Sequence, residues 1–385
     1  MKKTIAVFFG GKSTEHDISI ITALSSVIKP LELTKKFDVV PIYIAKDGRW
    51  FSDPKLKDIS IFRDKSIDEF CAKSKPISIV FGGGMIIRKS GFKNIDIKID
   101  IAFPAMHGAY GEDGSLMGLL RMAGIPFVGS DMSASVVSMD KVLSKQLAEA
   151  SNIPTPKFVF FSKSEFESTH DLIIEKVTNN LKYPMFVKPP HLGSSIGIAK
   201  VHNDDELSNA IEVAAYYDDK ILVEEAVDNL IEVTVPIIGN DILQPGMVER
   251  PLLLDDKFFD FNSKYINSGG KKGGGKKMGS QGYSELPANI NQDLYMAALE
   301  TAQKVYRTIG CEGISRIDLL IDSKTQIIYF NEVNPMPGDL YIHNWRASGL
   351  SSVDLVERLV ELAEERFEKN TKIETTFSSS FLKQF

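Results

Sequence analysis

The sequence predicts an α/β protein in which an open, mostly parallel sheet is followed by two α+β domains. Three observations support this prediction. The 385 residues exceed what one ordinary hydrophobic core organises, so two or three domains are expected. The first third of the chain alternates short apolar runs with amphipathic helical patterns, which is typical of a parallel sheet. Later segments have the pattern of strand–helix–strand units and of a polar hairpin.

The composition is that of a globular protein, with 43% hydrophobic and 25% charged residues. A net charge of −6 gives no general nucleic-acid signature, and no apolar run approaches the length of a bilayer span, so neither partner is expected. The apolar start of the chain is interrupted at Gly10-Gly11 and then turns charged, which favours a buried strand over a signal peptide. Cys71 and Cys311 are far apart, so a reducing cytoplasm is the expected compartment.

The first domain is expected over residues 1–133. A continuous apolar run near its start is typical of a strand buried on both faces. The expected elements are strands at residues 4–9, 37–44 and 100–105 and helices at residues 18–28 and from about residue 115. Residues 45–99 hold irregular, mixed segments that give no assignment.

The central domain is expected over residues 134–228, where two strand–helix–strand units follow a helix at residues 139–150. The third domain is expected over residues 229–385. It contains a helix at residues 291–309, a hairpin and a last amphipathic helix. No order is predicted for the C-terminal tail.

One segment of the third domain, near residues 262–283, is predicted to be a lid. Its aromatic start, which includes Lys264 and Tyr265, leads into a stretch of glycines and lysines that cannot form a core. An anchored aromatic segment that enters a mobile loop is typical of active-site lids. The alternative is that the aromatic residues belong to the core and that the lysines are a solvated face.

The hairpin predicted over residues 315–338 carries the most specific chemistry. Alternate residues of a strand share a face, so Arg316 and Asp318 point the same way. The residues expected to share a face of the second strand are Phe330, Glu332 and Asn334. If the two faces coincide, two carboxylates and an amide oxygen lie beside a guanidinium, which suits Mg²⁺ together with phosphates. The alternative is a surface hairpin with scattered charges.

Two further segments have residues suited to anions or to ammonium groups. Lys188 ends a predicted strand and is followed by Gly193-Ser194-Ser195, so its ammonium and the backbone N–H groups can approach a phosphate. The alternative is an ordinary hairpin loop. Glu15 stands at a helix start, where it suits either the helix dipole or a substrate ammonium.

Three acids near the apolar strand at residues 221–225 suit a nucleotide base and sugar. Glu224 and Glu225 are adjacent, so they point to opposite faces, and one of them can accept a hydrogen bond from an adenine amine. Glu232 can bind ribose hydroxyls. Taken alone, each of these acids is more often a solvated surface residue.

Eight short motifs, in this order, resemble those of the D-alanine–D-alanine ligases of the ATP-grasp superfamily. The motifs are GGKSTEHDIS, HGAYGEDGSL, SMDK, VKPPHLGSSIG, ILVEE, KY, SRID and NEVNPMPG. The resemblance covers roughly residues 1–365. It implies three domains, with ATP bound between the second and the third, and a homodimer formed through the first domain.

The resemblance also implies roles in binding the nucleotide and metal. Phosphate contacts are implied for Lys141, Lys188, Lys264, Ser194 and Ser195. Adenine contacts are implied for Glu224 and for the backbone of Glu225 and Val227, and a ribose contact for Glu232. Two Mg²⁺ ions, or Mn²⁺ in their place, are implied at Asp318, Glu332 and Asn334.

On the substrate side, the resemblance implies that Glu15 binds the ammonium of the first D-alanine, with His107 nearby. Arg316 and the Gly338 N–H are implied to stabilise the oxyanion of the reaction. Ser194 and Tyr265 are implied to couple lid closure to the substrate pocket.

The implied reaction joins two D-alanines through an acyl phosphate, for peptidoglycan precursor synthesis. The family usually has a serine five residues after the glycine that corresponds to Gly338, where this chain has His343, and the predicted lid is longer and more basic than usual. Both departures lie on the second-substrate side, so D-serine, D-lactate or another amino acid is an alternative acceptor. Tyr265 favours an amino acid over a hydroxy acid. A nucleotide-binding module without turnover is the remaining alternative.

Overall fold

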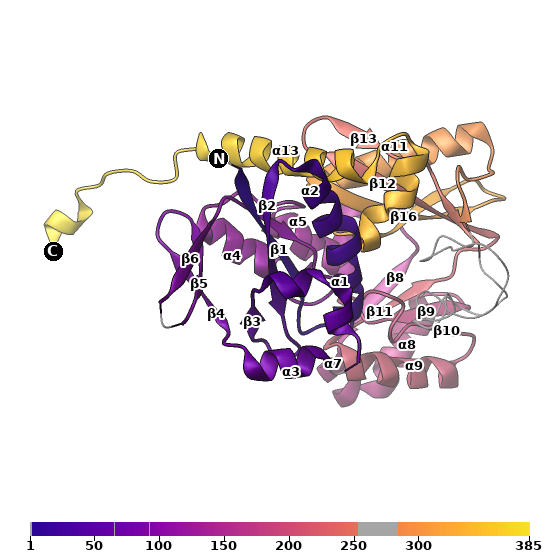
Figure 1. The fold of residues 1–385 in the computed structure, drawn as a ribbon. Coiled ribbons are helices and arrows are strands. Elements are labelled where there is room, and N and C mark those ends of the chain that lie inside the picture. The colour runs from indigo at the N-terminus through magenta and orange to yellow at the C-terminus, as the bar shows by residue number, and fades with distance from the viewer. Residues whose placement is uncertain (1, 65, 92, 253–283) are drawn as a thin grey trace.

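The computed structural model describes residues 2–64, 66–91, 93–252 and 284–385, which form an α/β protein built around successive sheets (Figure 1). The first sheet has the strand order β3-β2-β1-β7. Its strands are β1 (Lys3–Gly10), β2 (Phe37–Ile44), β3 (Trp50–Phe51) and β7 (Ile101–Pro104). β1 is parallel to both of its neighbours, and only the short β3 is antiparallel. The predicted open parallel sheet is therefore confirmed.

The first strand is buried on both faces, as its apolar sequence predicts. Every side chain from residue 5 to residue 9 is fully buried. Alternate members of the strand belong to two different core clusters, one on each face of the sheet.

The first helix is longer than the predicted residues 18–28. α1 (His16–Ile21), a π-helical segment η1 (Thr22–Ile28) and α2 (Lys29–Thr34) follow one another without a break and end at Lys35 in a left-handed conformation. The π-helical segment stands directly before the turn that contains Pro30. Because proline lacks an N–H, it would interrupt an α-helix there, and a π-helical turn is a common adjustment.

Residues 45–99, which gave no assignment from sequence, form short elements that flank the first sheet. They are β3, the 3₁₀ turns η2 (Pro54–Lys57) and η3 (Ile59–Phe62), α3 (Ser66–Lys73), β4 (Ile77–Phe81), β5 (Met85–Lys89) and β6 (Ile95–Ile99). The last three strands make an antiparallel sheet with β5 in the middle. Met85 and Ile87 of β5 are fully buried and join the core below the first sheet.

Three helices lead from the first sheet to the second: α4 (Ser115–Ala123), α5 (Met132–Met139) and α6 (Lys141–Ala150). The predicted helix at residues 139–150 begins two residues later than expected. Asp140 is the reason, because its carboxylate accepts hydrogen bonds from the N–H groups of Val142 and Leu143 and so caps α6.

The second sheet is antiparallel and has the order β10-β9-β11-β8. Its elements are β8 (Phe158–Ser162), α7 (Lys163–Ser168), α8 (His170–Asn180), β9 (Met185–Lys188), β10 (Ala199–Val201), α9 (Asp204–Tyr217) and β11 (Lys220–Glu225). Apolar residues of α8 and α9 pack on one face of the sheet in a core of their own. The other face is thereby left to the lysines and acids described below.

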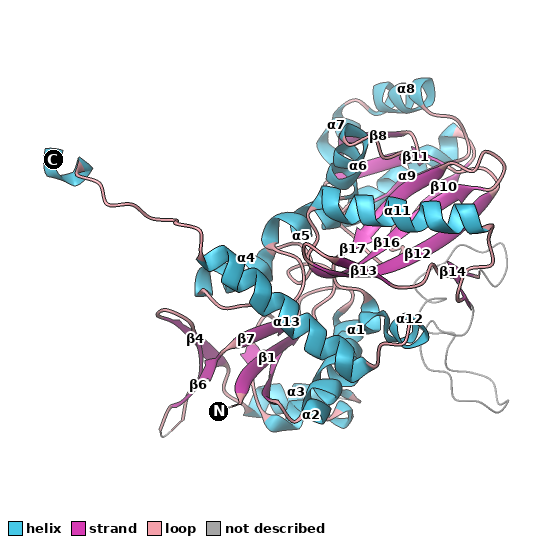
Figure 2. Cartoon of the chain, turned by 90° about the horizontal axis from the view of Figure 1, so that it is seen from above, coloured by secondary structure: helices cyan, strands magenta, loops and turns pink. Residues whose placement is uncertain are grey.

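The third sheet is also antiparallel, with the order β13-β12-β16-β17, and α11 packs across one face (Figure 2). Its strands are β12 (Leu230–Gly239), β13 (Leu243–Pro245), β16 (Gly313–Asp322) and β17 (Ile328–Asn334), and α11 spans Gln292–Ile309. β14 (Arg250–Pro251) and β15 (Ser284–Glu285) pair beside it. The predicted helix and hairpin are confirmed.

The last elements of the chain return to the first sheet. They are η6 (Gly338–Tyr341), α12 (Ile342–Ala347) and α13 (Ser352–Thr371), whereas the short turn η7 (Phe381–Gln384) lies in an exposed tail that leads away from the sheet (Figure 1). α13 packs against α2, and its residues share one hydrophobic core with β1 (Figure 1). Arg366 of α13 is buried and donates a hydrogen bond to the Phe127 carbonyl at 2.6 Å. The core of the first sheet is therefore completed by the C-terminal helix.

Among the helices in the described part of the chain, none has the length and apolar character needed to cross a bilayer.

Replacing Leu359 with alanine should lower the free energy of unfolding by about 2–5 kcal/mol, because the side chain is fully buried between α13 and the first sheet. Urea unfolding of both proteins measures the difference. Leu33→Ala is the matched control, since Leu33 lies on α2 with 60% of its surface exposed. Equal midpoints for Leu359→Ala and wild type would contradict this account of the core.

Candidate active site

The β16–β17 hairpin presents its polar residues on the face opposite α11. Arg316 lies opposite Asn334, and Asp318 lies opposite Glu332, in one antiparallel ladder. Directly opposite residues have neighbouring side chains, so the predicted meeting of these four residues is borne out in the ladder. The apolar residues between them pack against α11.

A β-bulge makes one part of the hairpin prediction wrong. Leu319 pairs with Phe330, although Asp318 pairs with Glu332, so Asn331 is an extra residue in β17. The bulge turns Phe330 into the core, where it is fully buried, instead of onto the face of Glu332. It also brings Asn331 to the polar side, where its Oδ1 accepts a hydrogen bond from Lys188 Nζ at 3.3 Å.

Arg316 and Asp318 form a bidentate ion pair. The Arg316 Nε and Nη2 atoms lie 2.7 and 2.6 Å from the two Asp318 oxygens, and Asn334 Nδ2 lies 3.1 Å from Asp318 Oδ2. The guanidinium also stands 5.3 Å from the centre of the Tyr341 ring. Although burial alone would lower the pKa of Arg316, the Asp318 charge raises it, so the residue is a fixed cation.

The same residues form a donor set that fits a divalent metal. Asp318 and Glu332 are carboxylates from opposite strands, Asn334 adds an amide next to Asp318, and the first two side chains are 14% and 24% exposed. Hard oxygen donors with partial access from solvent are what Mg²⁺ and Mn²⁺ bind, usually with substrate phosphates completing the shell.

Three lysines gather around these acids. Lys141, the first residue of α6, lies 3.0 Å from Glu332 Oε2 and donates to the Leu192 carbonyl at 2.8 Å. Lys188, at the end of β9, and Lys145, one turn after Lys141, both pair with the buried Glu224. The ammonium of Lys145 is 2.9 Å from Glu224 Oε2. Three ammonium groups therefore lie close together between the second and the third sheet.

Glu224 is the buried centre of this charge cluster. Burial alone would raise the pKa of its carboxyl, but the neighbouring Lys145 and Lys188 ammonium groups lower it to about 2. The pKa of Lys188 is raised by the same pairing, against the effect of burial. Sequence reasoning missed Lys145. The sequence feature that could have revealed Lys145 is its position four residues after Lys141, on the same face of an amphipathic helix.

The loop between β9 and β10 contacts the first domain. Ser194 and Ser195 have φ angles of 55° and 59°, and Ser194 Oγ donates a hydrogen bond to the Glu15 carboxylate. At Gly193, a Cβ atom would stand 3.1 Å from Glu15 Oε2, so glycine allows this close approach. The two segments that the sequence marked separately therefore meet.

Glu15 belongs to a buried polar group beneath that loop. It is 8% exposed at the start of α1. His107 Nε2 lies 2.9 Å from Thr22 Oγ1, and burial lowers the pKa of His107. Sequence reasoning missed Glu112, which accepts from the Gly108 N–H at 2.6 Å and the Met336 N–H at 3.3 Å. Burial and the nearby Glu15 raise the pKa of Glu112 to about 8.

Gly338 opens a tight turn that fixes the segment after the hairpin. The next three residues, Asp339, Leu340 and Tyr341, all have left-handed φ angles of 49–56°. Such conformations are unfavourable for residues other than glycine, so contacts must hold them. The Asp339 N–H donates to Thr22 Oγ1 at 3.0 Å, and Tyr341 Oη lies 2.9 Å from Thr234 Oγ1.

His343 is engaged by a buried acid. Its Nε2 lies 2.8 and 2.9 Å from the two oxygens of Glu249, and Asn344 Nδ2 donates to the same carboxylate at 3.2 Å. Burial alone would raise the pKa of Glu249, but the hydrogen bond from His343 lowers it. The His343 ring also lies 4.5 Å from that of Tyr341, which in turn stands against Arg316.

The remaining residues of the predicted site lie on β12, at or after the end of β11, or outside the described residues. Glu232 is exposed on β12, and the Glu225 N–H donates a hydrogen bond to the Lys157 carbonyl. Val227 lies in the partly buried segment after β11. Lys264, Tyr265 and the predicted lid lie outside the described residues.

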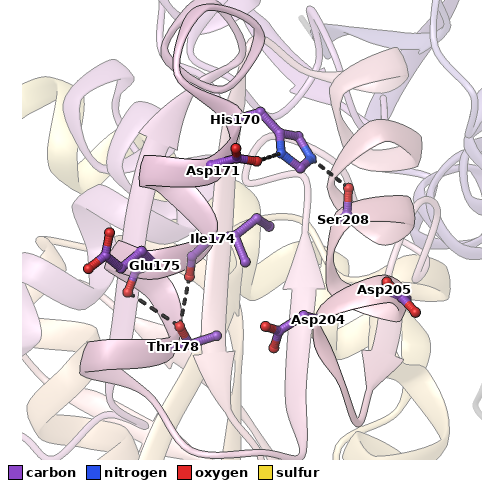
Figure 3. A pocket seen from close by; sticks show the side chains of 8 residues that line it. All are labelled: His170, Asp171, Ile174, Glu175, Thr178, Asp204, Asp205 and Ser208. Carbon is purple, nitrogen blue, oxygen red and sulfur yellow. Dashed lines mark hydrogen bonds and ion pairs between the residues drawn. The ribbon is translucent and has the colours of Figure 1, made fainter.

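A surface pocket of about 460 Å³ lies elsewhere, between α8 and α9 (Figure 3). His170 there bridges Asp171 and Ser208, with ring nitrogens 2.9 and 2.8 Å from their oxygens. The pocket is lined by residues other than those predicted for the site and carries several acids, so it does not resemble a site for a polyphosphate.

Two antiparallel sheets that converge on lysines, carboxylates and a glycine–serine loop define the ATP-grasp fold, whose members couple ATP to ligation. Comparisons with known proteins show which family within this class the chain matches. Residues 4–130 match the family described as D-ala D-ala ligase N-terminus, and residues 147–361 match D-ala D-ala ligase C-terminus.

Individual relatives are similar to this chain in sequence over nearly its whole length. The D-alanine–D-alanine ligase of Clostridium novyi is 35% identical, over 96% of this chain and 100% of its own length. The D-alanine–D-alanine ligase of Clostridium acetobutylicum is 36% identical, over 95% of this chain and 99% of its own length. Among solved structures, the VanG D-Ala:D-Ser ligase of Enterococcus faecalis has a TM-score of 0.76 and 33% identity, covering 94% of this chain and 100% of its own.

The chain belongs to the D-alanine–D-alanine ligase family. Its function is that of an ADP-forming ligase of peptidoglycan precursor synthesis, and the family depends on ATP and on metal ions.

Replacing Glu224 with glutamine should lower the free energy of unfolding by about 3–5 kcal/mol near neutral pH, because two buried ammonium groups lose their counter-charge. The lowered pKa of Glu224 means that its contribution is fully present above the unfolded-state pKa, roughly 4.3, and is lost as the pH falls through about 2. Thermal unfolding from pH 3 to pH 8 should therefore show the difference shrinking in acid.

Glu225→Gln is the control for this prediction. Its carboxylate accepts one hydrogen bond, from the Lys182 N–H at 3.0 Å, and glutamine keeps an acceptor oxygen there. A Glu224→Gln variant as stable as this control would show that the lysines do not depend on the buried charge.

Proposed function

We propose that this protein activates one D-alanine with ATP as an acyl phosphate and joins it to a second D-alanine. The observation that carries the proposal is the contact of three separate elements at one place. Lys141 of α6 and Lys188 of β9 reach the polar face of the β16–β17 hairpin through Glu332 and Asn331. A polyphosphate needs this combination of cations and metal-binding oxygens.

The lysines are proposed to hold the ATP phosphates. Lys141 and Lys188 supply the charge, and the backbone around Ser194 and Ser195 supplies N–H donors. Glu224 is proposed to orient Lys188 from its buried position, in addition to its proposed place beside adenine, because both of its oxygens face ammonium groups. Val227, the Glu225 backbone and Glu232 complete the proposed nucleoside contacts.

Two Mg²⁺ ions are proposed at Asp318, Glu332 and Asn334. When bound, they offset the charge of the γ-phosphate so that a carboxylate can approach it. The chain prepares for this by holding Asp318 against Arg316 and Glu332 against Lys141, so that each carboxylate is oriented by its ion pair.

The first D-alanine is proposed to place its ammonium at Glu15, near His107. The Ser194 hydroxyl, which donates to Glu15, fixes the carboxylate and links the substrate pocket to the phosphate loop. Arg316 and the Gly338 N–H are proposed to stabilise the oxyanion that forms when the second amine attacks. A donor in such a position contributes about 3–4 kcal/mol.

Water must be kept from an acyl phosphate, since it hydrolyses readily. The predicted lid, with Lys264 and Tyr265, is proposed to do this. The reaction is proposed to take place in the cytoplasm, and dimerisation through the first domain stays a prediction.

A ligase with D-serine as the acceptor is the second candidate. It is favoured by the 33% identity to an enzyme described as a D-Ala:D-Ser ligase and by His343 in place of the usual serine. D-lactate is the weaker option, because Tyr265 favours an amine acceptor.

A panel of D-alanine, D-serine, D-lactate and other amino acids, each offered with D-alanine and ATP, should give the fastest ADP release and dipeptide formation with two D-alanines. Mass spectrometry identifies the product and a coupled assay counts the ADP. A higher kcat/KM for D-serine would establish the second candidate instead.

Replacing Glu332 with glutamine should reduce ADP production by at least about 100-fold, because a metal-binding carboxylate and the partner of Lys141 are lost together. Circular dichroism should show an unchanged fold. Glu300→Gln, on the exposed side of α11, is the control. Turnover like that of wild type in Glu332→Gln would refute the metal assignment.

Replacing His343 with serine, the usual family residue, should change the KM of the second amino acid by about tenfold while the KM of ATP stays constant. The physical reason is that buried Glu249 loses the hydrogen bond to the His343 ring, next to Tyr341 and Arg316. An unchanged acceptor KM would show that His343 serves only the packing of α12.

A further inference from the structure

We propose that His191 is a positioning residue which, as a doubly protonated imidazolium, holds the phosphate-binding loop against the start of α6 and thereby sets the affinity for ATP. The inference rests on the proposed function, because it gives His191 a task at the ATP site of that reaction.

The geometry of the ring requires two protons. His191 Nδ1 lies 2.9 and 3.0 Å from the two oxygens of Asp218, and Nε2 lies 3.2 Å from Asp140 Oδ2. A neutral imidazole has only one N–H, so its other nitrogen would face a carboxylate lone pair. The imidazolium donates to both acids at once.

Burial of the two acids strengthens this arrangement. The side chains of Asp140 and Asp218 are each 5% exposed, so their charges are poorly screened by water. Hydrogen bonds from Asp140 and Asp218 raise the pKa of His191 to about 9. The imidazolium is therefore the stable form near neutral pH.

The two acids belong to different elements, so one ring joins three segments. Asp140 caps α6 with its other oxygen, directly before Lys141. Asp218 follows the end of α9 and also accepts from the His191 backbone N–H at 2.9 Å. The loop after β9 is thus held to α6 on one side and to the α9–β11 turn on the other.

The contacts of His191 with Asp140 and Asp218 form a clamp. This clamp acts on the residues that are proposed to touch ATP. The same loop offers the Pro190 carbonyl to the Lys141 N–H at 3.4 Å and the Leu192 carbonyl to Lys141 Nζ at 2.8 Å. Ser194 and Ser195 follow within four residues. A shift of His191 would therefore move Lys141 and the serine N–H groups relative to each other, which weakens the binding of one anion by both.

The charges around the ring are balanced. Lys220 Nζ lies 2.6 Å from Asp140 Oδ2, so two acids face two cations in the buried part of the cluster. Asp219 adds an exposed acid, and its oxygen lies within 4.8 Å of ligand atoms of His191 and Asp218. A metal ion there would require a neutral imidazole, which the contact with Asp140 opposes.

The test compares three variants with wild type: His191→Asn, His191→Arg and, as the matched control, His202→Asn. His202 lies on the same domain, is 60% exposed and pairs only locally in the described structure, with Glu206 at 3.2 Å. Binding of a non-hydrolysable ATP analogue is measured by calorimetry from pH 7 to pH 10, and kcat and the KM of ATP are measured at pH 7.5.

His191→Asn should weaken analogue binding and raise the KM of ATP by about tenfold, while kcat changes by less than about threefold. In wild type, the native-state imidazolium is the main form below the raised pKa of about 9 and loses its proton as the pH rises through that value, so the affinity for the analogue should fall there. His191→Arg keeps a permanent charge with forked donors. It should retain most of the affinity and lose the fall near pH 9.

An affinity of His191→Asn equal to that of His202→Asn would overturn the inference. A fall near pH 9 that persists in both His191 variants would overturn it too, because another group would then be titrating. Failure of the proposed function looks different, since wild type itself would then bind no analogue and release no ADP. If His191→Asn does not fold, the pH profile of His191→Arg decides alone.

Discussion

The binding of a polyphosphate requires several ammonium groups to be close together, and their mutual repulsion is the constraint on which this structure depends. Glu224 relieves it. Its carboxylate lies in the protein interior between Lys145 and Lys188 and pairs with both, so each lysine has a counter-charge that also fixes its position. Glu224 of β11, Lys188 of β9 and the first turns of α6 must meet for this to happen. The pairing of β11 with β9 sets Lys188 opposite Leu222, two residues before Glu224 on the same face, so the two side chains are close.

Single side chains also join parts of the chain that are distant in sequence. Ser194 of the central sheet donates to Glu15 of the first domain, and Thr22 of η1 is shared by His107 and the backbone of Asp339. The pocket proposed for the substrate therefore has walls from three regions. Such shared contacts explain why the left-handed turn after Gly338 can be maintained although it is locally unfavourable.

Most of the fold follows from patterns that are local in sequence. The buried first strand, helix α11 and the hairpin were predicted because apolar periodicity and turn residues determine them. The bulge at Asn331 was not predictable, since it depends on how β17 pairs with β16, and it moved Phe330 to the core. Lys145, Glu112 and the partners of His191 were missed for a similar reason. Their importance comes from burial and from neighbours far along the chain.

Helix α13 has a consequence for the order of events during synthesis. The strands and helices of the first domain leave the ribosome early, but the hydrophobic surface that α13 covers stays open until about residue 370 has been made. Domains usually fold as units in the order in which they emerge. In this chain the first domain cannot complete its core until the last long helix has been made. A nascent chain therefore exposes, for most of its translation, an apolar surface that chaperones would recognise.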